Sequence, residues 1–419
     1  MKVLVLNSGS STLKFDVVEV YAAKGDREKS SKLAHGSIDR IGHESTLDFH
    51  TSSGASYRQK AAVIDHHDAV SQALAWLNSI DVQTSGQIRV KIEAVGHRIV
   101  HGGDRFVSPT LIDDSVLSAL KSLNELAPLH NPAALQGIRA ARAVLGPNIP
   151  MVAAFDTAFH NSLPEYAATY ALPYELAERH QVRRYGFHGI AHEYMLRRYA
   201  EIANISTNNA TLITLQLGNG CSATSIRNGR SVDTSMGFTP LEGLVMGTRS
   251  GDLDPGIVGY LARKEGASID EVERWLNERS GLLGLSGRSS DMRDLIETME
   301  QDRRTAVAVE VFCYRVRKYI GAYMVALGGA DAIVFGGGIG ENAPDIRTRI
   351  CEGMEWLGIQ LDQARNAATI GKEGRISAND SKIHIYVILV DESILIAQST
   401  VECIFQGEPE KKKMGESLL

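Results

Sequence analysis

The chain has 419 residues, 43% hydrophobic and 22% charged, with a formal net charge of −6. This length exceeds one comfortable hydrophobic core, so two domains are expected. The net negative charge and the lack of a long basic run before the C-terminal tail argue against a nucleic-acid partner. The four cysteines form no Cys-x-x-Cys pair, which argues against a disulfide or zinc framework. No signal peptide or membrane span is predicted, so a cytoplasmic protein without a membrane partner is expected.

A polar turn between two apolar runs is the first feature of the chain. Residues 3–6 form an unbroken apolar run, typical of a strand buried on both faces, and residues 13–20 predict a second strand. The turn at residues 7–11 contains only Asn, Ser and Gly, whose backbone N–H groups and hydroxyls suit anionic oxygens, and Lys14 adds a positive charge. Taken alone, the stretch favours an ordinary hairpin with a polar tip.

Charged residues interrupt or end two further apolar runs. Arg98 lies within residues 92–100, and a charge among apolar neighbours favours an anion ligand at a strand end over a solvated surface arginine. Residues 149–155 predict a strand that delivers Asp156 at its carboxyl end, where ligands gather in α/β sheets. Asp156 could equally cap a following turn, and the sequence leaves both roles open. Asn131, followed by proline, is expected to cap a helix.

Histidine pairs four residues apart occur twice, at His97 and His101 and at His188 and His192. This spacing can bind zinc on a helix face. Neither pair has the His-Glu-x-x-His form, however, and no thiol lies nearby in the sequence. Buried histidines that support other residues are therefore expected in place of metal ligands.

A flexible or tightly turned segment carries Arg249, which lies between Gly247 and Gly251. A guanidinium in this setting suits bidentate binding of a phosphate or a carboxylate. A salt bridge with Asp252 or Asp254 at the surface is the less favoured interpretation.

The second half of the chain repeats the plan of the first. Residues 211–217 and 221–226 predict two strands joined by a Gly-Asn-Gly turn, so two similar halves are expected. Further on, a strand at residues 332–335 runs into a glycine loop and a helix start, which suits nucleotide phosphates. The glycine spacing matches neither the dinucleotide fingerprint nor the P-loop. A last strand is expected to end at Asp391 and Glu392.

Together these features favour phosphoryl transfer. The chain offers two phosphate-type turns, a glycine loop before a helix, glycine-flanked arginines and strand-end carboxylates, and it lacks a Ser-His-Asp or thiol nucleophile signature. Catalysis of phosphoryl transfer consists mostly of positioning and charge neutralisation. Carboxylates would hold Mg²⁺, often through water, while arginines and a histidine would stabilise the oxygens of the transferring group.

Several motifs resemble the acetate kinase family in order and spacing, over almost the whole chain. They are Asn-Ser-Gly-Ser-Ser-Thr-Leu-Lys at 7–14, Gly-His-Arg-Ile-Val-His-Gly-Gly at 96–103, Phe-Asp-Thr-Ala-Phe-His at 155–160, Arg-Tyr-Gly-Phe-His-Gly at 184–189, Gly-Leu-Val-Met-Gly-Thr-Arg-Ser-Gly-Asp at 243–252, Gly-Gly-Ile-Gly-Glu-Asn at 337–342 and Asp-Glu at 391–392. The resemblance implies an α/β fold of two duplicated actin-like or ribonuclease-H-like domains with a nucleotide cleft between them.

The resemblance also implies how the chain is divided and what it binds. Residues 1–155 with 393–419 would form the N-terminal domain, which includes a returning C-terminal helix. Residues 156–392 would form the nucleotide-binding domain. ATP would be the co-substrate, Mg²⁺ the metal cofactor with Mn²⁺ as a substitute, and the protein a homodimer.

Individual roles follow from the same resemblance. Asp156 matches the residue labelled as the family's catalytic acid/base, and His188 and Arg249 match its transition-state stabilisers. Arg98 would bind the substrate carboxylate or acyl phosphate. The acyl pocket would be lined by Val100, Leu129, Phe187 and Pro240. The nucleotide would contact Lys14, Gln216, Leu217, Gly218, Asn219, Gly220, Asp291, Met292, Arg293, Gly338, Ile339, Gly340, Glu341 and Asn342. The metal and phosphate site would contain Asn7 and Glu392.

Some positions depart from the family pattern. Gln216 stands where histidine is usual. Glutamine can still hydrogen-bond a phosphate oxygen but carries no charge. Activity with weaker phosphate binding is therefore expected. Thr12 replaces the commoner serine and keeps the hydroxyl. Ser393 stands where a second carboxylate is common, which leaves Glu392 as the one expected carboxylate after Asp391.

We therefore expect reversible, in-line transfer of the γ-phosphoryl group of Mg-ATP to acetate. Acetate is already ionised at neutral pH, so we assign Asp156 to orienting Mg²⁺ and its water, against the family's proton-transfer label. Propionate kinase is the alternative among enzymes, because one methylene is worth only about 1–3 kcal/mol in a pocket; Val100 narrows the pocket and favours acetate. A nucleotide-binding regulator without catalysis is the alternative from another class, suggested by Gln216.

Overall fold

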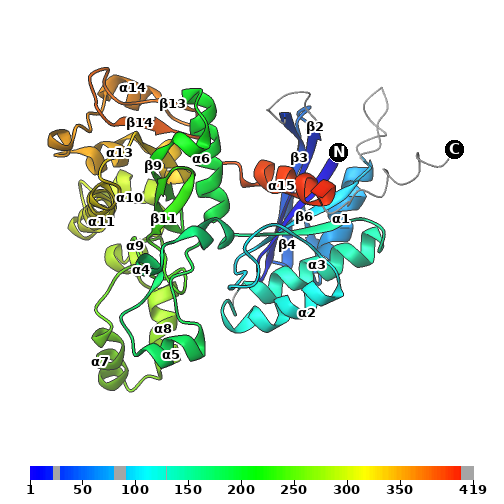
Figure 1. Ribbon diagram of the computed structural model, residues 1–419. Helices are drawn as coiled ribbons and strands as arrows, with labels where there is room; N and C mark the ends of the chain where they lie inside the picture. The colour runs from blue at the N-terminus through cyan, green and yellow to red at the C-terminus, as the bar shows by residue number, and fades with distance from the viewer. Residues whose placement is uncertain (22–28, 80–90, 129, 407–419) are drawn as a thin grey trace, which may run out of the picture. The chain divides into compact units, whose positions relative to one another are not determined.

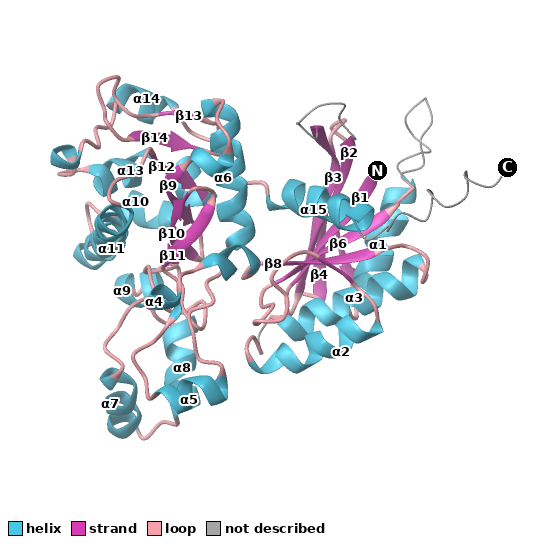
Figure 2. Cartoon of the chain, viewed as in Figure 1, coloured by secondary structure: helices cyan, strands magenta, loops and turns pink. Residues whose placement is uncertain are grey.

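The computed structural model describes residues 1–21, 29–79, 91–128 and 130–406, which form two compact units (Figures 1 and 2). The first unit is Met1–Ala158 together with the segment from Asp391 onward, and the second is Phe159–Val390. Boundaries after residues 155 and 392, as expected from the sequence, would have placed Asp156 and Glu392 in the second unit. In the structure Asp156 lies in the first unit, and its backbone N–H donates to the carbonyl of Ile99 on β6 at 2.9 Å.

A mixed sheet in the order β5-β4-β3-β2-β1-β6-β8-β7 forms the centre of the first unit. Its strands are β1 (Lys2–Ser8), β2 (Thr12–Tyr21), β3 (Lys29–Asp39), β4 (Glu44–Thr51), β5 (Ser56–Ala62), β6 (Ala94–Ile99), β7 (Thr110–Leu111) and β8 (Met151–Phe155). Strands β1, β6 and β8 are parallel to one another, and the other neighbours are antiparallel. The predicted N-terminal hairpin is confirmed as β1 and β2.

Helices cover both faces of this sheet. They are α1 (His66–Ser79), α2 (Asp114–Ser122), α3 (Asn131–Leu145) and α15 (Glu392–Gln406). Leu6 and Val95 pack in one apolar cluster with residues of α1 and α3. Gly96, whose side of the strand is opposite that of Val95, faces α15, since a Cβ there would lie 2.7 Å from Ile396 Cγ2. The returning helix α15 therefore packs closely on β6 because Gly96 has no side chain (Figure 1).

The capping role expected for Asn131 is wrong. Asn131 lies inside α3, and His130 is the residue before the helix. The Asn131 amide instead bonds the backbone of His101: the His101 N–H donates to Oδ1 at 3.2 Å, and Nδ2 donates to the His101 carbonyl at 3.1 Å. A buried amide satisfies both backbone groups of a loop at once, and this tertiary contact replaces the local cap.

The second unit is built on a sheet of the same plan, in the order β11-β10-β9-β12-β14-β13. Its strands are β9 (Thr211–Leu217), β10 (Cys221–Arg227), β11 (Arg230–Thr234), β12 (Ala332–Gly336), β13 (Gly374–Arg375) and β14 (His384–Val387). Strands β9, β12 and β14 are parallel, as β1, β6 and β8 are in the first unit. The predicted duplication is thus confirmed, with β9 and β10 as the second hairpin.

The second unit carries most of the helices. They are α4 (Glu165–Ala168), α5 (Tyr174–His180), α6 (Gly189–Ala203), α7 (Gly256–Glu265), α8 (Ile269–Glu278), α9 (Gly281–Ser286), α10 (Met292–Thr298), α11 (Arg303–Leu327), α12 (Gly337–Asn342), α13 (Pro344–Cys351) and α14 (Gln363–Ala368). Residues of α6 pack on β9 and β12, and α11 packs on β9 and β10. The expected glycine loop after β12 is wrong in detail, because α12 begins directly where the strand ends. None of the helices described is both long enough and apolar enough to cross a membrane.

Candidate functional site

A buried ion cluster lies at the carboxyl ends of β6 and β8 in the first unit. Arg98, on β6, donates from Nε to Asp156 Oδ1 at 3.0 Å and from Nη2 to Oδ2 at 2.8 Å, a bidentate pair. Its remaining nitrogen, Nη1, contacts Glu392 Oε2 at 2.9 Å. Burial alone would lower the pKa of Arg98, but the two carboxylates raise it above its ordinary value. Arg98 therefore stays cationic in a fixed orientation.

The end of the second unit's sheet leads into Asp391 and Glu392, which have different partners. Asp391 Oδ2 contacts Lys32 Nζ at 2.8 Å, and Asp391 Oδ1 accepts the Ser393 hydroxyl at the start of α15. Burial would raise the pKa of Asp391, but these hydrogen bonds lower it overall. Glu392, in contrast, has a raised pKa because burial and the nearby charges of Asp156 and Asp391 outweigh Arg98. Asp391 is thus paired with Lys32, whereas Glu392 is paired with Arg98.

Asn7 and Lys14 belong to the same end of the sheet. They are cross-strand partners in the hairpin of β1 and β2, and Leu6 pairs with His97, so Asn7 and Arg98 follow on neighbouring strands. The side-chain oxygens at this end of the sheet fit a magnesium ion. Such an ion takes few protein oxygens and completes its coordination shell with water and phosphate. Asp156 and Glu392 share one guanidinium, and the excess negative charge suits a divalent cation. No group of three or more His, Cys, Asp or Glu with metal-site geometry occurs among the described residues.

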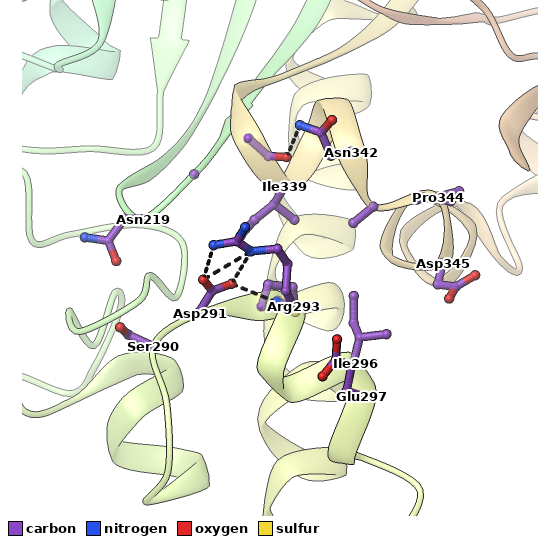
Figure 3. Close-up of a pocket in the computed structure, with 14 residues that line it drawn as sticks. Asn219, Ser290, Asp291, Arg293, Ile296, Glu297, Ile339, Asn342, Pro344 and Asp345 are labelled. Atoms are coloured by element: carbon purple, nitrogen blue, oxygen red, sulfur yellow. Dashed lines mark hydrogen bonds and ion pairs between the residues drawn. The ribbon is translucent and has the colours of Figure 1, made fainter. Parts of the chain in front are cut away.

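The second unit contains a cavity of about 950 Å³. Figure 3 shows Asn219 on one side, α10 with Asp291 and Arg293 on another, and the region of Ile339 and Asn342 opposite. Asp291 caps α10 by accepting the Arg293 N–H at 2.9 Å, and its carboxylate also binds the Arg293 guanidinium. Apolar side chains such as Met292, Ile296 and Ile339 share the lining with polar and charged ones. Small-molecule sites combine apolar walls with a few polar groups in the same way.

Many residues predicted for the nucleotide site line this cavity. They are Gly218, Asn219, Asp291, Met292, Arg293, Gly338, Ile339 and Asn342. Gln216, Leu217, Gly220, Gly340 and Glu341 are not among the lining residues, and Lys14 belongs to the first unit. The Glu341 carboxylate instead accepts the N–H groups of Gly337 and Val390 at 2.9 and 3.0 Å, and burial raises its pKa.

Several lining residues were missed. They are Ser290, Ile296, Glu297, Ala343, Pro344 and Asp345. Ile296 and Glu297 lie one helical turn beyond Met292 and Arg293 on α10, so the helical period itself could have indicated them. The others adjoin predicted residues in the sequence.

His188 and Arg249 meet at the turn that follows β9. A Cβ on Gly220 would lie 3.3 Å from His188 Cε1 and 3.8 Å from Arg249 Nη1. His188 has a left-handed backbone (φ 57°) immediately before α6, a conformation that is uncommon outside glycine and often marks functional sites. The two side chains and the backbone of this turn therefore share a small region of the second unit.

The Arg249 guanidinium has no carboxylate partner among the residues that the structure describes. It donates to the carbonyl of Pro240 at 3.3 Å, and burial lowers its pKa. The salt bridge considered from the sequence does not form: Asp252 accepts the Gly243 N–H and the Tyr319 hydroxyl, and Asp254 accepts the Gly256 N–H. A half-buried cation without a counterion is suited to binding an anion.

The residues expected to line an acyl pocket are divided between the units. Val100 follows β6 in the first unit, whereas Phe187 and Pro240 belong to the second. Phe187 is buried, and its carbonyl bonds His160 Nε2 at 3.0 Å. Leu129 lies outside the described residues.

Gln216 is at the carboxyl end of β9, beside Gly336 of β12. Its side-chain oxygen is buried without a hydrogen-bond partner in the described part of the chain. A buried acceptor left unsatisfied costs about 1–3 kcal/mol, and a ligand that donates a hydrogen bond would relieve it.

Comparison with known proteins agrees with these features. A model of the Acetokinase family matches residues 2–398. The chain belongs to this family. An acetate kinase of Chloroherpeton thalassium is 49% identical over 417 residues, covering 97% of this chain and 100% of the relative. The crystal structure of Porphyromonas gingivalis acetate kinase has 40% identity and a TM-score of 0.88, covering 96% of this chain and 99% of that one.

The acetokinase fold also occurs in a solved propionate kinase. The enzyme from Francisella tularensis subsp. tularensis SCHU S4 is 38% identical with a TM-score of 0.87, covering 96% of this chain and 99% of that one. Membership of the acetokinase family makes the chain a phosphotransferase with a carboxyl group as acceptor and ATP as co-substrate. The two-domain actin-like architecture expected from the sequence is thereby confirmed.

Proposed function

We propose that this chain transfers the γ-phosphoryl group of Mg-ATP to acetate, reversibly, giving acetyl phosphate and ADP. The observation that carries the proposal is Arg249, a half-buried guanidinium without a carboxylate partner among the described residues, beside His188 and the Gly218–Gly220 turn. Family membership and the acetate kinase relatives support acetate as the acceptor.

The nucleotide is assigned to the cavity of the second unit. Asn219, Ile339 and Asn342 lie on its walls, and its volume of about 950 Å³ suits a nucleotide. Arg249 and His188 then stabilise the charge that spreads over the oxygens of the transferring group. Mg²⁺, when bound, neutralises phosphate charge, and Asn7 and Glu392 are the side chains we assign to hold it.

In the first unit, Arg98 is assigned to the acceptor carboxylate or to the acyl phosphate product. Asp156 fixes the guanidinium through two hydrogen bonds, so the cation is oriented before substrate arrives. The acetate carboxylate needs no base, because it is ionised at neutral pH. Each Asp156 oxygen retains a lone pair that can accept a hydrogen bond from metal-bound water, which supports an orienting role over proton transfer.

Trapping of acyl phosphate as its hydroxamate tests this function. The purified protein is incubated with Mg-ATP and acetate, propionate or butyrate, and kcat/KM is compared among the acids. The highest value with acetate is expected. A higher value with propionate would keep the chemistry and overturn the argument from Val100. ATP binding without product from any acid would refute the function and favour the regulator suggested by Gln216.

We also propose that the protein is a homodimer that acts in the cytoplasm. The dimer is implied by the family resemblance, and size-exclusion chromatography with light scattering tests it directly. A monomeric mass across the micromolar concentration range would contradict it.

A further inference from the structure

A chain of buried hydrogen bonds leads from the interior of the second unit to His188. Thr214 Oγ1 on β9 and His192 Nδ1 on α6 are 2.7 Å apart, and His192 Nε2 and Ser222 Oγ on β10 are 2.8 Å apart. Ser222 Oγ in turn lies 2.9 Å from His188 Nδ1. Thr214, His192 and Ser222 are fully buried. We refer to these three residues as the relay.

The direction of the relay follows from its inner end. The Thr214 hydroxyl donates to the carbonyl of Thr224 at 3.4 Å, and a carbonyl can only accept. Because a hydroxyl has one proton, Thr214 Oγ1 must accept a hydrogen bond from His192 Nδ1. His192 is neutral, since burial lowers its pKa well below the ordinary value and His160 and His188 add to this effect. Its single proton is therefore on Nδ1.

The same count of protons fixes the direction of the hydrogen bond between Ser222 and His188, at the outer end of the relay. Neutral His192 offers Ser222 only the lone pair of Nε2, so the Ser222 hydroxyl donates its proton inward. Ser222 Oγ then offers only lone pairs to His188, whose Nδ1 must be the donor. In neutral His188 the other ring nitrogen, Nε2, consequently carries no proton.

We propose that the relay fixes the proton of His188 on Nδ1, so that His188 donates a hydrogen bond from Nε2 to the transferring phosphoryl group only as an imidazolium. The relay residues touch neither substrate nor nucleotide in this proposal and are positioning residues. The edge of the His188 ring that carries Nε2 approaches Gly220. Arg249 Nη1 approaches Gly220 as well. This inference rests on the proposed phosphoryl-transfer function.

The charges around His188 determine when the imidazolium forms. Arg249 is cationic and opposes a second positive charge nearby, while His192, with His160 packed edge-to-face against its ring, stays neutral. The negative charge of bound phosphates favours protonation. The rate is therefore expected to have an alkaline limb in kcat that reports loss of the Nε2 proton with the substrates bound.

Thr214→Val tests the relay without altering His188, Ser222 or His192. Valine has the shape of threonine and removes the acceptor for His192 Nδ1, so neutral His192 moves its proton to Nε2 and the relay reverses. Ser222 then donates to His188 Nδ1, and neutral His188 carries its proton on Nε2. The matched control is Thr224→Val, since Thr224 is the cross-strand neighbour of Thr214 and its hydroxyl bonds Thr234 at 2.9 Å.

The first measurement is the ¹⁵N spectrum of ¹⁵N-histidine-labelled protein at alkaline pH, with His188→Gln to assign the signals. We expect a protonated Nδ1 and an unprotonated Nε2 for His188 in the wild type and in Thr224→Val, and the opposite pattern in Thr214→Val. An Nε2-protonated neutral His188 in the wild type would overturn the proposal.

The second measurement is the pH dependence of kcat. In Thr214→Val the alkaline limb should shift to higher pH or vanish, with at most roughly a tenfold loss at neutral pH, the worth of about one hydrogen bond. Thr224→Val should keep the wild-type profile. Unchanged profiles in both variants would contradict the relay.

If Thr214→Val does not fold, Ser222→Ala takes its place, because it removes the hydroxyl that connects the rings of His188 and His192. Ser225→Ala on the same strand is then the control. Failure of all acids to give acyl phosphate would refute the proposed function, while the spectra would still decide the relay.

Discussion

Replacement of Arg98 by methionine removes the cation of the buried cluster while keeping much of the side-chain volume. Asp156 and Glu392 then lose the guanidinium that contacts both of them, while the more distant charge of Lys14 still acts on Glu392. Their side chains are 2% and 22% exposed, and that of Arg98 is 16% exposed, so water replaces little of the lost interaction. We expect Arg98→Met to destabilise the first unit strongly at neutral pH.

The magnitude follows from the contacts. Two opposite charges about 4 Å apart attract by about 4 kcal/mol at an effective dielectric constant near 20. Arg98 makes such a pair with each carboxylate, but part of this energy offsets the cost of burying the guanidinium. Breaking a buried pair from one side typically costs about 3–5 kcal/mol. For a unit of this size that corresponds to a fall in Tm of about 6–20 °C.

The pH dependence has a definite sign. Burial already raises the pKa of Glu392 above its value in an unfolded chain, and loss of Arg98 raises this pKa further. The folded variant then holds a proton that the unfolded chain releases, so its stability falls as pH rises through that range. The destabilisation of Arg98→Met relative to wild type is therefore largest at pH 7 and smaller at pH 5.

Urea unfolding followed by tryptophan fluorescence measures this effect in the first unit alone. The chain has three tryptophans, and with Trp275 and Trp356 replaced by phenylalanine only Trp76 reports. Trp76 packs against Phe15 and Phe49 within the first unit. The double variant Arg98→Met with Asp156→Asn should recover part of the loss, because one of the two carboxylates is gone. A destabilisation below about 1 kcal/mol, or equal losses at pH 5 and pH 7, would refute the reasoning.

Three further predictions concern catalysis. Arg249→Ala should lower kcat by about 10²–10³-fold with nucleotide affinity retained in calorimetry, because Arg249 does not line the nucleotide cavity; a wild-type kcat would contradict its assignment. Asp156→Asn should weaken the dependence of rate on Mg²⁺ and leave the shape of the pH–rate profile unchanged, whereas loss of a limb would favour proton transfer. Gly220→Ala adds a methyl 3.3 Å from the His188 ring and should lower kcat by about tenfold through misplacement; Gly321→Ala, with nothing within 4 Å of its Cβ, should not.

Local patterns were sufficient to predict the hairpins and the charged strand ends. The apolar runs at β1 and β9 are short, continuous and bounded by turn residues, so their strand assignment needed no tertiary information. Arg98 was recognised because a charge within an apolar run has little access to water, and Asp156 because it stands at the carboxyl end of a predicted strand. Their pairing with each other was not predicted, since it depends on β6 and β8 being neighbours in the sheet.

Other features depend on contacts that no local pattern encodes. Asn131 had the sequence signature of a cap, but the loop at His101 provides partners for both ends of its amide. Glu392 was distinguished from Asp391 only through the family resemblance, because Lys32, which binds Asp391, comes from β3 and no local pattern shows this contact. Glu341 lies in a nucleotide-type motif yet bonds the backbone of Gly337 and Val390.

The duplicated plan places different side chains at equivalent strand ends of the two units. Strands β1 and β9 have the same length and the same sequence of buried and half-buried positions, and each has an amide side chain next to its end, Asn7 in one and Gln216 in the other. The neighbouring parallel strand then differs. Strand β6 carries Arg98, which contacts Asp156 and Glu392. Strand β12 ends at Gly336 and is followed by the glycines of α12. Gly336 leaves room for the side chains of Val390 and Met195, since a Cβ there would lie 2.6 Å from Val390 Cγ2 and 2.8 Å from Met195 Sδ. On the function proposed above, the same scaffold would provide the acceptor site in one unit and the nucleotide site in the other, with different side chains at equivalent strand ends.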